Sequence, residues 1–334
     1  MAGSTDAALS AQPPGAPTNA LSFSFLGVPV SVRCADPAIR RLFVACYGKP
    51  ARREQATSVH YAVARSPASG GLSLVGPGRR RWRPRGEGDL LYLLDGDLSV
   101  QLQRRRPELY FLHSAVLGRH GLAALIVGPS GVGKSTAAWA LTHHGFEFKG
   151  DELAPVDLQR LCVHPYFRAL CLKTPPPARY PVPPGARRTS RGWHLPAHLL
   201  PGGRSAAPLP VGALLFLRRD GGAGTPVVSP VTRADAVTRL YASSLNALVH
   251  DDGGLAPAVR LARAVPAFEV QTVDLARAAA GISAVLERQA ADRGAPTEAP
   301  SARGQTRAMT RRAKASATPH FSGLPVANIN SCNP

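Results

Sequence analysis

One segment of the sequence has residue types and spacing suited to binding a triphosphate. Residues 128–136 read Gly-Pro-Ser-Gly-Val-Gly-Lys-Ser-Thr and fit the P-loop pattern G-x-x-x-x-G-K-[ST] without a mismatch. In such a loop the lysine would bridge the β- and γ-phosphates and the hydroxyl that follows it would bind Mg2+. We therefore predict a nucleotide site. Its residues are Gly128, Pro129, Ser130, Gly131, Val132, Gly133, Lys134, Ser135 and Thr136.

The chain on both sides of this loop supports the interpretation. Leu122–Val127 is an apolar run typical of a buried strand, and residues 136–144 combine helix formers with apolar residues at helical spacing. The loop would thus join a strand to a helix N-terminus, where N–H groups and the helix dipole favour an anion. Glycines let the backbone approach that anion where a side chain would block it. The alternative is a glycine-rich turn that carries Lys-Ser by chance.

Phosphoryl transfer also needs a carboxylate near the γ-phosphate, either as a proton acceptor or to hold Mg2+ through its shell. Asp151 and Glu152 follow a short predicted strand that returns from the P-loop helix toward the phosphate edge of the sheet. The rival is Asp220, after the apolar strand 213–217, although two arginines intervene and a glycine-rich turn follows. We favour Asp151 as the base or metal-shell carboxylate.

Three further basic residues could take part in the site. His113 lies on a predicted strand that pairs with the P-loop strand, although a histidine there is more often a hydrogen-bonded core residue. Arg168 and Lys173 flank an apolar Leu-Cys-Leu segment and could reach phosphate oxygens, although a solvated side chain is the ordinary outcome for an arginine.

The composition is that of a globular chain with a large arginine excess. The 334 residues have room for one large or two ordinary domains, and 44% are hydrophobic. The formal net charge of +19 could attract nucleic acid. However, only five of the 40 basic residues are lysines, and the arginines are scattered, with one dense cluster at 79–85. We interpret this as compositional bias and expect an acidic protein or peptide as partner at least as readily as nucleic acid.

The sequence shows no signs of secretion, membrane insertion or a cysteine-based metal site. Its five cysteines lack C-x-x-C spacing, so we expect reduced thiols. No apolar run approaches eighteen residues, and the N-terminus lacks the features of a signal peptide. We expect a cytoplasmic protein without membrane contact.

Before the P-loop, the pattern predicts a disordered segment at 1–20 and a β-rich N-terminal region at 21–107. Pro37–Tyr47 is the one predicted helix there. The predicted strands cover residues 23–32, 58–64, 90–94 and 98–102, with Asp95-Gly96-Asp97 as a hairpin turn between the last two.

The remaining chain predicts an α/β domain at 108–290 and a flexible basic tail at 291–334. Strands are expected at 110–117, 146–149, 153–158, 161–164, 170–173, 213–217 and 268–272. Helices are expected at 234–247, 256–263 and 275–289. Six prolines and several arginines predict an extended loop at 174–191.

Several of these motifs together resemble the catalytic domain of the HPr kinase/phosphorylase family. They are His113-Ser-Ala-Val-Leu, the loop 128–136, Gly145, and Gly150-Asp-Glu-Leu, and the resemblance covers about 108–290. The segment from His164 to Lys173 is similar to that of the shorter kinase-like relatives often associated with peptide-maturation clusters.

The resemblance implies a fold related to phosphoenolpyruvate carboxykinase, with a mixed sheet around the P-loop. It also implies transfer of the ATP γ-phosphate to a serine hydroxyl. Asp151 falls on the first acid of the family's Asp-Asp pair, which is the proton acceptor, and Glu152 replaces the second acid. His113 falls on the histidine of the strand before the P-loop.

Three functions remain open from the sequence. The first is an ATP-dependent serine kinase acting on a protein or peptide, with Asp151, Lys134 and His113 in catalytic roles and Ser135 and Glu152 as Mg2+ ligands. The second is a nucleotide-binding regulatory protein that hydrolyses little. The third is a nucleic-acid-associated NTPase that uses the arginine cluster at 79–85. A homo-oligomer also remains possible.

Overall fold

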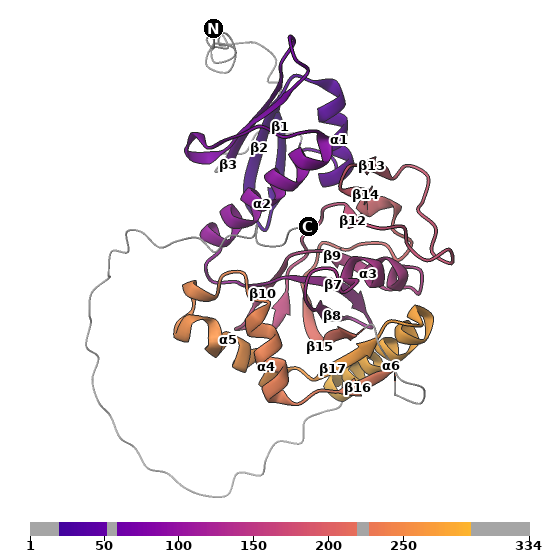
Figure 1. Cartoon of the computed structure of the whole chain (residues 1–334). Coiled ribbons are helices and arrows are strands. Elements are labelled where there is room, and N and C mark those ends of the chain that lie inside the picture. The colour runs from indigo at the N-terminus through magenta and orange to yellow at the C-terminus, as the bar shows by residue number, and fades with distance from the viewer. Residues whose placement is uncertain (1–19, 52–58, 219–226, 295–334) are drawn as a thin grey trace, which may run out of the picture.

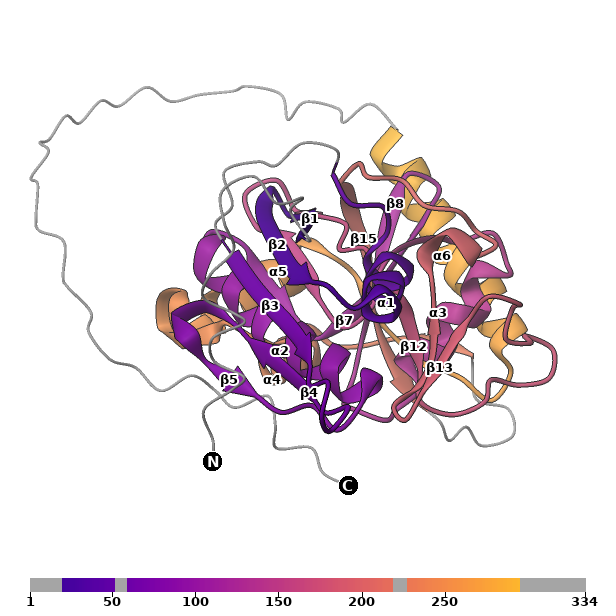
Figure 2. The same cartoon turned by 90° about the horizontal axis from the view of Figure 1, so that it is seen from above.

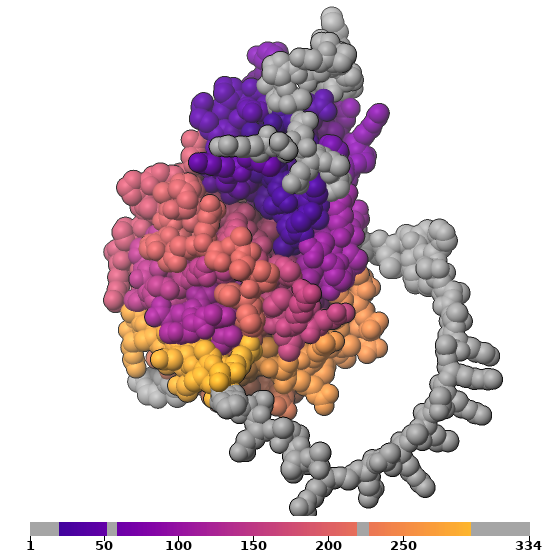
Figure 3. All heavy atoms as spheres, turned by 180° about the vertical axis from the view of Figure 1, so that it is seen from behind, coloured from indigo at the N-terminus to yellow at the C-terminus, as the bar shows by residue number. Residues whose placement is uncertain are grey.

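The computed structural model describes residues 20–51, 59–218 and 227–294, which form a mixed α/β structure (Figure 1). These ranges contain three sheets and six α-helices. Residues 20–51 and 59–105, here called the N-terminal unit, gather in one lobe (Figure 3). The rest, here called the C-terminal unit, is built around a nine-stranded sheet. The predicted disordered segment and basic tail lie outside the described residues, apart from Ala20 and 291–294.

The N-terminal unit contains a five-stranded sheet in the order β1-β2-β3-β4-β5. Its strands are β1 (Ala20–Phe25), β2 (Val28–Cys34), β3 (Val59–Arg65), β4 (Leu72–Val75) and β5 (Arg81–Trp82). The predicted helix at Pro37–Tyr47 is confirmed as α1, because Asp36 caps it by accepting from the backbone of Ala38 and Ile39. The helix connects β2 to β3, which pair in parallel.

A second helix, α2 (Glu87–Arg105), replaces the hairpin predicted at 90–102. That prediction was wrong because Leu90, Leu94, Leu98 and Leu102 recur every four residues and are all buried, which is a helical period. Acidic residues in the first turn and arginines in the last turn also favour a helix. Asp95-Gly96-Asp97 therefore lies inside a helix and not in a turn.

The nine-stranded sheet follows the order β6-β10-β11-β15-β8-β7-β9, with β17 paired to β15 and β16 paired to β17. The strand β8 that precedes the glycine-rich loop runs parallel to β15, and Ile126 lies opposite Leu215. The strands are β6 (Tyr110–Leu112), β7 (Ser114–Arg119), β8 (Leu122–Val127), β9 (Glu147–Gly150), β10 (Ala154–Asp157), β11 (Cys162–Val163), β15 (Leu209–Arg218), β16 (Val228–Pro230) and β17 (Ala267–Gln271). The single strand predicted at 110–117 is thus broken at His113.

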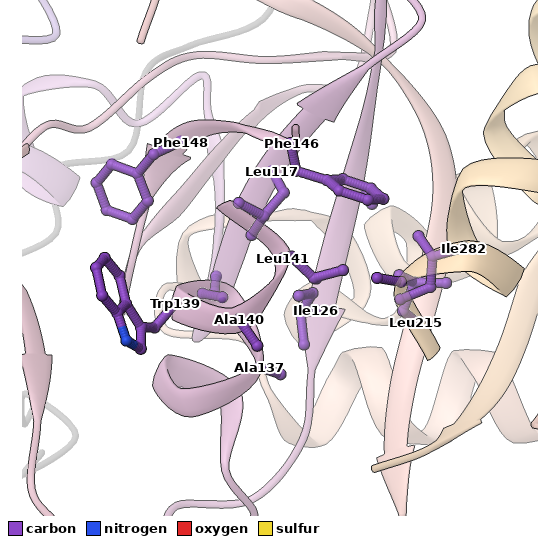
Figure 4. Close-up of a cluster of buried hydrophobic side chains, with 14 of the residues drawn as sticks. Leu117, Ile126, Ala137, Trp139, Ala140, Leu141, Phe146, Phe148, Leu215 and Ile282 are labelled. Carbon is purple, nitrogen blue, oxygen red and sulfur yellow. The ribbon is translucent and has the colours of Figure 1, made fainter. Parts of the chain in front are cut away.

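Helices cover both faces of the central strands (Figures 1 and 2). On one face, α3 (Lys134–Thr142) and α6 (Leu275–Gly294) pack on Ile126 and Leu215, as Figure 4 shows for Leu141 and Ile282. On the other, α4 (Arg233–Ala242) and α5 (Leu255–Ala264) pack on Leu125 and Leu214. Because β8 is buried on both faces, all six of its residues are apolar.

A small third sheet lies beside α3 and has the order β12-β14-β13. Its strands are β12 (Leu170–Leu172), β13 (Arg187–Thr189) and β14 (Gly192–Leu195). The loop predicted at 174–191 therefore contains one short strand near its end. Short 3-10 helices complete the described structure at Pro77–Arg79, Ala197–Leu199, Ala247–Val249 and Asp251–Gly254.

The two units share a hydrophobic core. Leu109, Phe111, Leu153, Tyr166 and Ala169 of the C-terminal unit belong to the same buried cluster as the sheet and helices of the N-terminal unit. The ring centroids of Tyr166 and Phe25 are 5.7 Å apart. The predicted domain boundary near 107 stays a prediction, and apolar packing continues across it. Within the described ranges, every helix is too short or too polar to span a bilayer.

Candidate functional site

The predicted phosphate loop follows the end of β8 and leads into α3. Residues 129–131 are exposed at this edge of the sheet. Gly131 and Gly133 have φ values of 81° and 105°, in the left-handed region that favours glycine. The glycines therefore let the chain turn sharply between a fully buried strand and a fully formed helix. This local geometry agrees with the strand, loop and helix predicted from the sequence.

Lys134 is the first residue of α3 and is 7% exposed. Its Nζ donates to the carbonyl oxygens of Gly128 and Pro129, at 2.7 and 3.0 Å. Burial lowers the pKa of Lys134, and the acids Glu152 and Asp151 partly offset this effect. The lysine thus holds a positive charge at the loop, within electrostatic reach of the acidic pair.

Asp151 meets the start of α3 although it lies sixteen residues farther along the chain. The Ser135 hydroxyl donates to Asp151 Oδ2 at 2.9 Å, and Asp151 is 1% exposed. The chain at Gly150, the last residue of β9, lies close to Tyr166. A Cβ added at Gly150 would lie only 3.0 Å from the carbonyl oxygen of Tyr166. Burial and the neighbouring Glu152 raise the pKa of Asp151 to about 6. A carboxyl group with this pKa can exchange a proton near neutral pH.

Glu152 lies at the other side of the turn, with a φ of 77°. Burial raises its pKa, but the charges of Arg168, His113, Lys173 and Lys134 outweigh burial and lower the pKa below its usual value. The pKa values of the two acids are thus shifted in opposite directions, and Asp151 is the member that holds a proton more readily.

His113 occupies the break between β6 and β7 and faces Glu152. Its Nδ1 lies 3.4 Å from Glu152 Oε2 and 3.3 Å from the Glu152 carbonyl oxygen. Burial lowers the pKa of His113, and the charge of Glu152 partly offsets this effect. The catalytic role of His113 stays a prediction, and the residue lies just before β7, which pairs with β8, and not on that strand as predicted.

Arg168 contacts both members of the acidic pair. Its guanidinium group pairs with Asp95 of α2 through Nη1, and Nη2 lies 3.8 Å from Glu152 Oε1. Its Nε donates to the Asp151 carbonyl oxygen at 3.5 Å. Sequence reasoning assigned Arg168 to phosphate binding, which stays a prediction, and it missed Asp95, because that residue was placed in a hairpin turn.

Two other predicted residues have different outcomes. Lys173 follows β12 and is exposed, and its charge lowers the pKa of Lys134 and of Glu152, so it lies within electrostatic reach of the site. Asp220, the rival carboxylate, lies outside the described residues, two positions beyond the end of β15. The structure therefore brings Lys134, Ser135, Asp151, Glu152 and His113 together and leaves Asp220 undecided.

A second group of metal-ligand types lies on the β10–β11 hairpin, where ligand atoms of Asp157, Cys162 and His164 are within 4.8 Å of one another. The carboxylate of Asp157 already has partners there. Oδ1 accepts from the backbone of Gln159 and Arg160, which closes the hairpin turn, and Oδ2 lies 4.0 Å from the Arg160 guanidinium. The turn and the arginine account for this cluster without an ion.

Comparison with known proteins gives a likeness to solved structures and no match in sequence. No family model matches the chain, and no curated protein matches it. Among solved structures it is similar to the Hpr(Ser) kinase/phosphatase from Coxiella burnetii, with 13% identity over 55% of this chain and 97% of that chain, at a TM-score of 0.31. A likeness this distant says nothing of the chemistry, which the side chains at the loop must carry.

Proposed function

We propose that this chain binds Mg·ATP at residues 128–136 and transfers the γ-phosphoryl group to a serine hydroxyl of a protein or peptide. The observation that carries the proposal is the hydrogen bond from Ser135 to Asp151, at 2.9 Å. It joins the hydroxyl expected to bind Mg2+ to a buried carboxyl group whose pKa is raised to about 6. A glycine-rich turn with a chance Lys-Ser pair has no reason to lie against such an acid.

The donor set around the loop fits a magnesium ion. Mg2+ prefers oxygen ligands and is commonly held by one or two protein oxygens together with substrate phosphates. Ser135 Oγ and the carboxylates of Asp151 and Glu152 are oxygens of this kind at one edge of the sheet. Bound there, Mg2+ would neutralise negative charge on the phosphates.

In the proposed transfer, Asp151 accepts the proton of the acceptor hydroxyl while the hydroxyl oxygen forms a bond to the γ-phosphorus. The bond from that phosphorus to the oxygen of ADP breaks, and the proton remains on Asp151 until it passes to solvent. Lys134 moves from the loop carbonyls to the phosphate oxygens and stabilises their charge. Because Asp151 must be ionised to act, we expect transfer to weaken below about pH 6.

The substitution Asp151→Asn tests this role, because asparagine keeps the size and can still accept from Ser135. We expect Mg·ATP to bind with little change while phosphoryl transfer falls by about 10²–10⁴-fold. The measurement is the transfer of labelled γ-phosphate to serine-bearing proteins encoded beside this chain, with ATP hydrolysis as the second readout.

Two results would contradict the proposal. Transfer at the parental rate in Asp151→Asn would move the role of the base elsewhere, with Asp220 as the next residue to substitute. A parent protein that binds ATP but neither hydrolyses it nor labels an acceptor would favour a nucleotide-binding regulatory protein.

A further inference from the structure

We propose that the N-terminal unit positions the acidic pair of the site through Asp95, which holds Arg168 against Asp151 and Glu152. This inference rests on the proposed function for its kinetic consequence, but its structural basis is independent of that function. It assigns a role to the unit formed by residues 20–51 and 59–105.

Arg168 joins the two units through charged contacts at the site itself. Its side chain is 12% exposed and divides one positive charge between Asp95 on α2 and Glu152 at the site. The third nitrogen, Nε, donates to the Asp151 carbonyl oxygen at 3.5 Å. A displacement of the guanidinium group would therefore move the segment that carries Asp151 or change the electrostatic environment of this proposed base.

Asp95 is itself held in place by the N-terminal unit. The Tyr47 hydroxyl, at the last residue of α1, donates to Asp95 Oδ1 at 2.6 Å, while Oδ2 pairs with Arg168. Ala169, next to Arg168 in the chain, donates its N–H to the Cys46 carbonyl oxygen at 2.6 Å. Both helices of the N-terminal unit thus hold the segment around Arg168, and the shared hydrophobic core keeps them there.

The arrangement has an expected direction of effect on the site. Asp95 holds Nη1 of Arg168, while Nη2 and Nε of the same planar group face Glu152 and the Asp151 carbonyl oxygen. An asparagine at position 95 would weaken the contact with Nη1, so the guanidinium group would hold the segment with Asp151 and Glu152 less precisely. Asp95 is thus a positioning residue that acts on phosphoryl transfer through Arg168.

The same helix offers a matched control. Asp97 is buried and, like Asp95, accepts from a tyrosine hydroxyl, that of Tyr61, at 2.8 Å. Its charged partner is Arg80, at 3.5 Å, which belongs to the N-terminal unit. Substitution of Asp97 by asparagine therefore removes a comparable buried charge from α2 without affecting Arg168.

The test compares Asp95→Asn with Asp97→Asn in the full chain, at a temperature where both remain folded. We expect the kcat for Mg·ATP turnover to fall by about tenfold in Asp95→Asn with KM for ATP changed less than about twofold, because the loop and Lys134 are untouched. Asp97→Asn should leave both constants unchanged. In an Arg168→Lys background, Asp95→Asn should add little further loss, because both substitutions break the same link.

A second readout does not need activity. Amide hydrogen exchange at residues 150–153 should become faster in Asp95→Asn and stay unchanged in Asp97→Asn. If the parent protein turns over no ATP and Lys134→Ala binds it as the parent does, the proposed function fails, and the exchange experiment still decides the coupling. Equal behaviour of the two variants in turnover and in exchange, or full additivity with Arg168→Lys, would overturn the coupling.

Discussion

In the N-terminal unit, the buried carboxylate of Asp97 accepts from Tyr61 and Gln101 and lies 3.5 Å from the Arg80 guanidinium. At the loop of the C-terminal unit, the buried carboxyl group of Asp151 accepts from Ser135 and lies beside a second acid, Glu152. Burial and Asp97 raise the pKa of Tyr61, so that tyrosine keeps its proton and remains a fixed donor. Donors surround Asp97, whereas burial and a neighbouring acid make the ionisation of Asp151 costly.

This difference separates two uses of a buried charge. An acid surrounded by donors contributes to stability, and its loss should weaken the fold. An acid placed beside another acid is strained when ionised, and such strain is typical of functional sites. The contrast can be tested one side chain at a time.

A large effect on turnover is expected at the loop lysine. Lys134→Ala should reduce Mg·ATP turnover by about 10²–10³-fold or more, since it removes a charge aimed at the phosphates. Lys149 is the control, because it is also buried, but its Nζ donates to the carbonyl oxygens of Ser205 and Ala207, away from the loop. Lys149→Ala should lower thermal stability and leave ATP affinity near that of the parent. Parental turnover in a folded Lys134→Ala variant would remove the phosphate-loop assignment.

The next effect concerns the stability of the N-terminal unit. Asp97→Asn should lower the free energy of unfolding by about 1–3 kcal/mol at pH 7, because Arg80, Tyr61 and Gln101 lose a charged acceptor. Chemical denaturation with an unchanged m-value would measure it. An unchanged free energy of unfolding would contradict the stabilising role that these three contacts indicate for Asp97.

The substitution Asp151→Asn should raise the stability of the fold, in contrast to Asp97→Asn. The folded-state pKa of about 6 lies above the usual 3.8, so the folded chain holds this proton more tightly than the unfolded chain. The associated stability is fully present below about pH 4 and is lost as the pH rises through about 6. The asparagine variant lacks this loss, so without nucleotide it should melt above the parent at pH 8 and close to it at pH 4. A variant that melts below the parent at pH 8 would contradict the claim that ionised Asp151 destabilises the folded chain.

The smallest effect is expected at an exposed arginine. Arg191 pairs with Asp89 at 2.9 Å and lies over the Tyr92 ring, 4.1 Å from its centroid, but it is 47% exposed. Arg191→Ala should change stability by no more than about 1 kcal/mol, because water and salt screen the pair. A loss several times larger would show that the exposed ion pair of Arg191 contributes more to stability than solvent screening allows.

The contacts explain which parts could be predicted from the sequence. The loop and its flanking elements depend on local residue types, so the pattern at 122–144 was sufficient. Asp151 was placed correctly because one short strand returns it to the same edge of the sheet. Helix α2 was missed because windows of five residues around Leu90 and Leu98 look like strands, while the spacing over nineteen residues is helical.

The link between Asp95 and Arg168 could not be read from local patterns. The two residues are 73 positions apart, and nothing near either one indicates the other. The break at His113 in the strand predicted at 110–117 has a similar cause. There β6 pairs with β10 while β7 pairs with β8 and β9, so the competition between distant strands decides where the chain bends.

The shared core also sets an order of events during protein synthesis. Sheet and helix residues of the N-terminal unit leave the ribosome first, but they pack against Leu153, Tyr166 and Ala169. At about 5–20 residues per second, the wait between Phe25 and Ala169 is on the order of ten seconds. During that time the apolar side of the nascent unit lacks its native cover. Holdase chaperones should therefore engage this chain at intermediate lengths, and ribosome-bound chains that end before Leu153 should bind them more strongly than chains that extend well past Ala169.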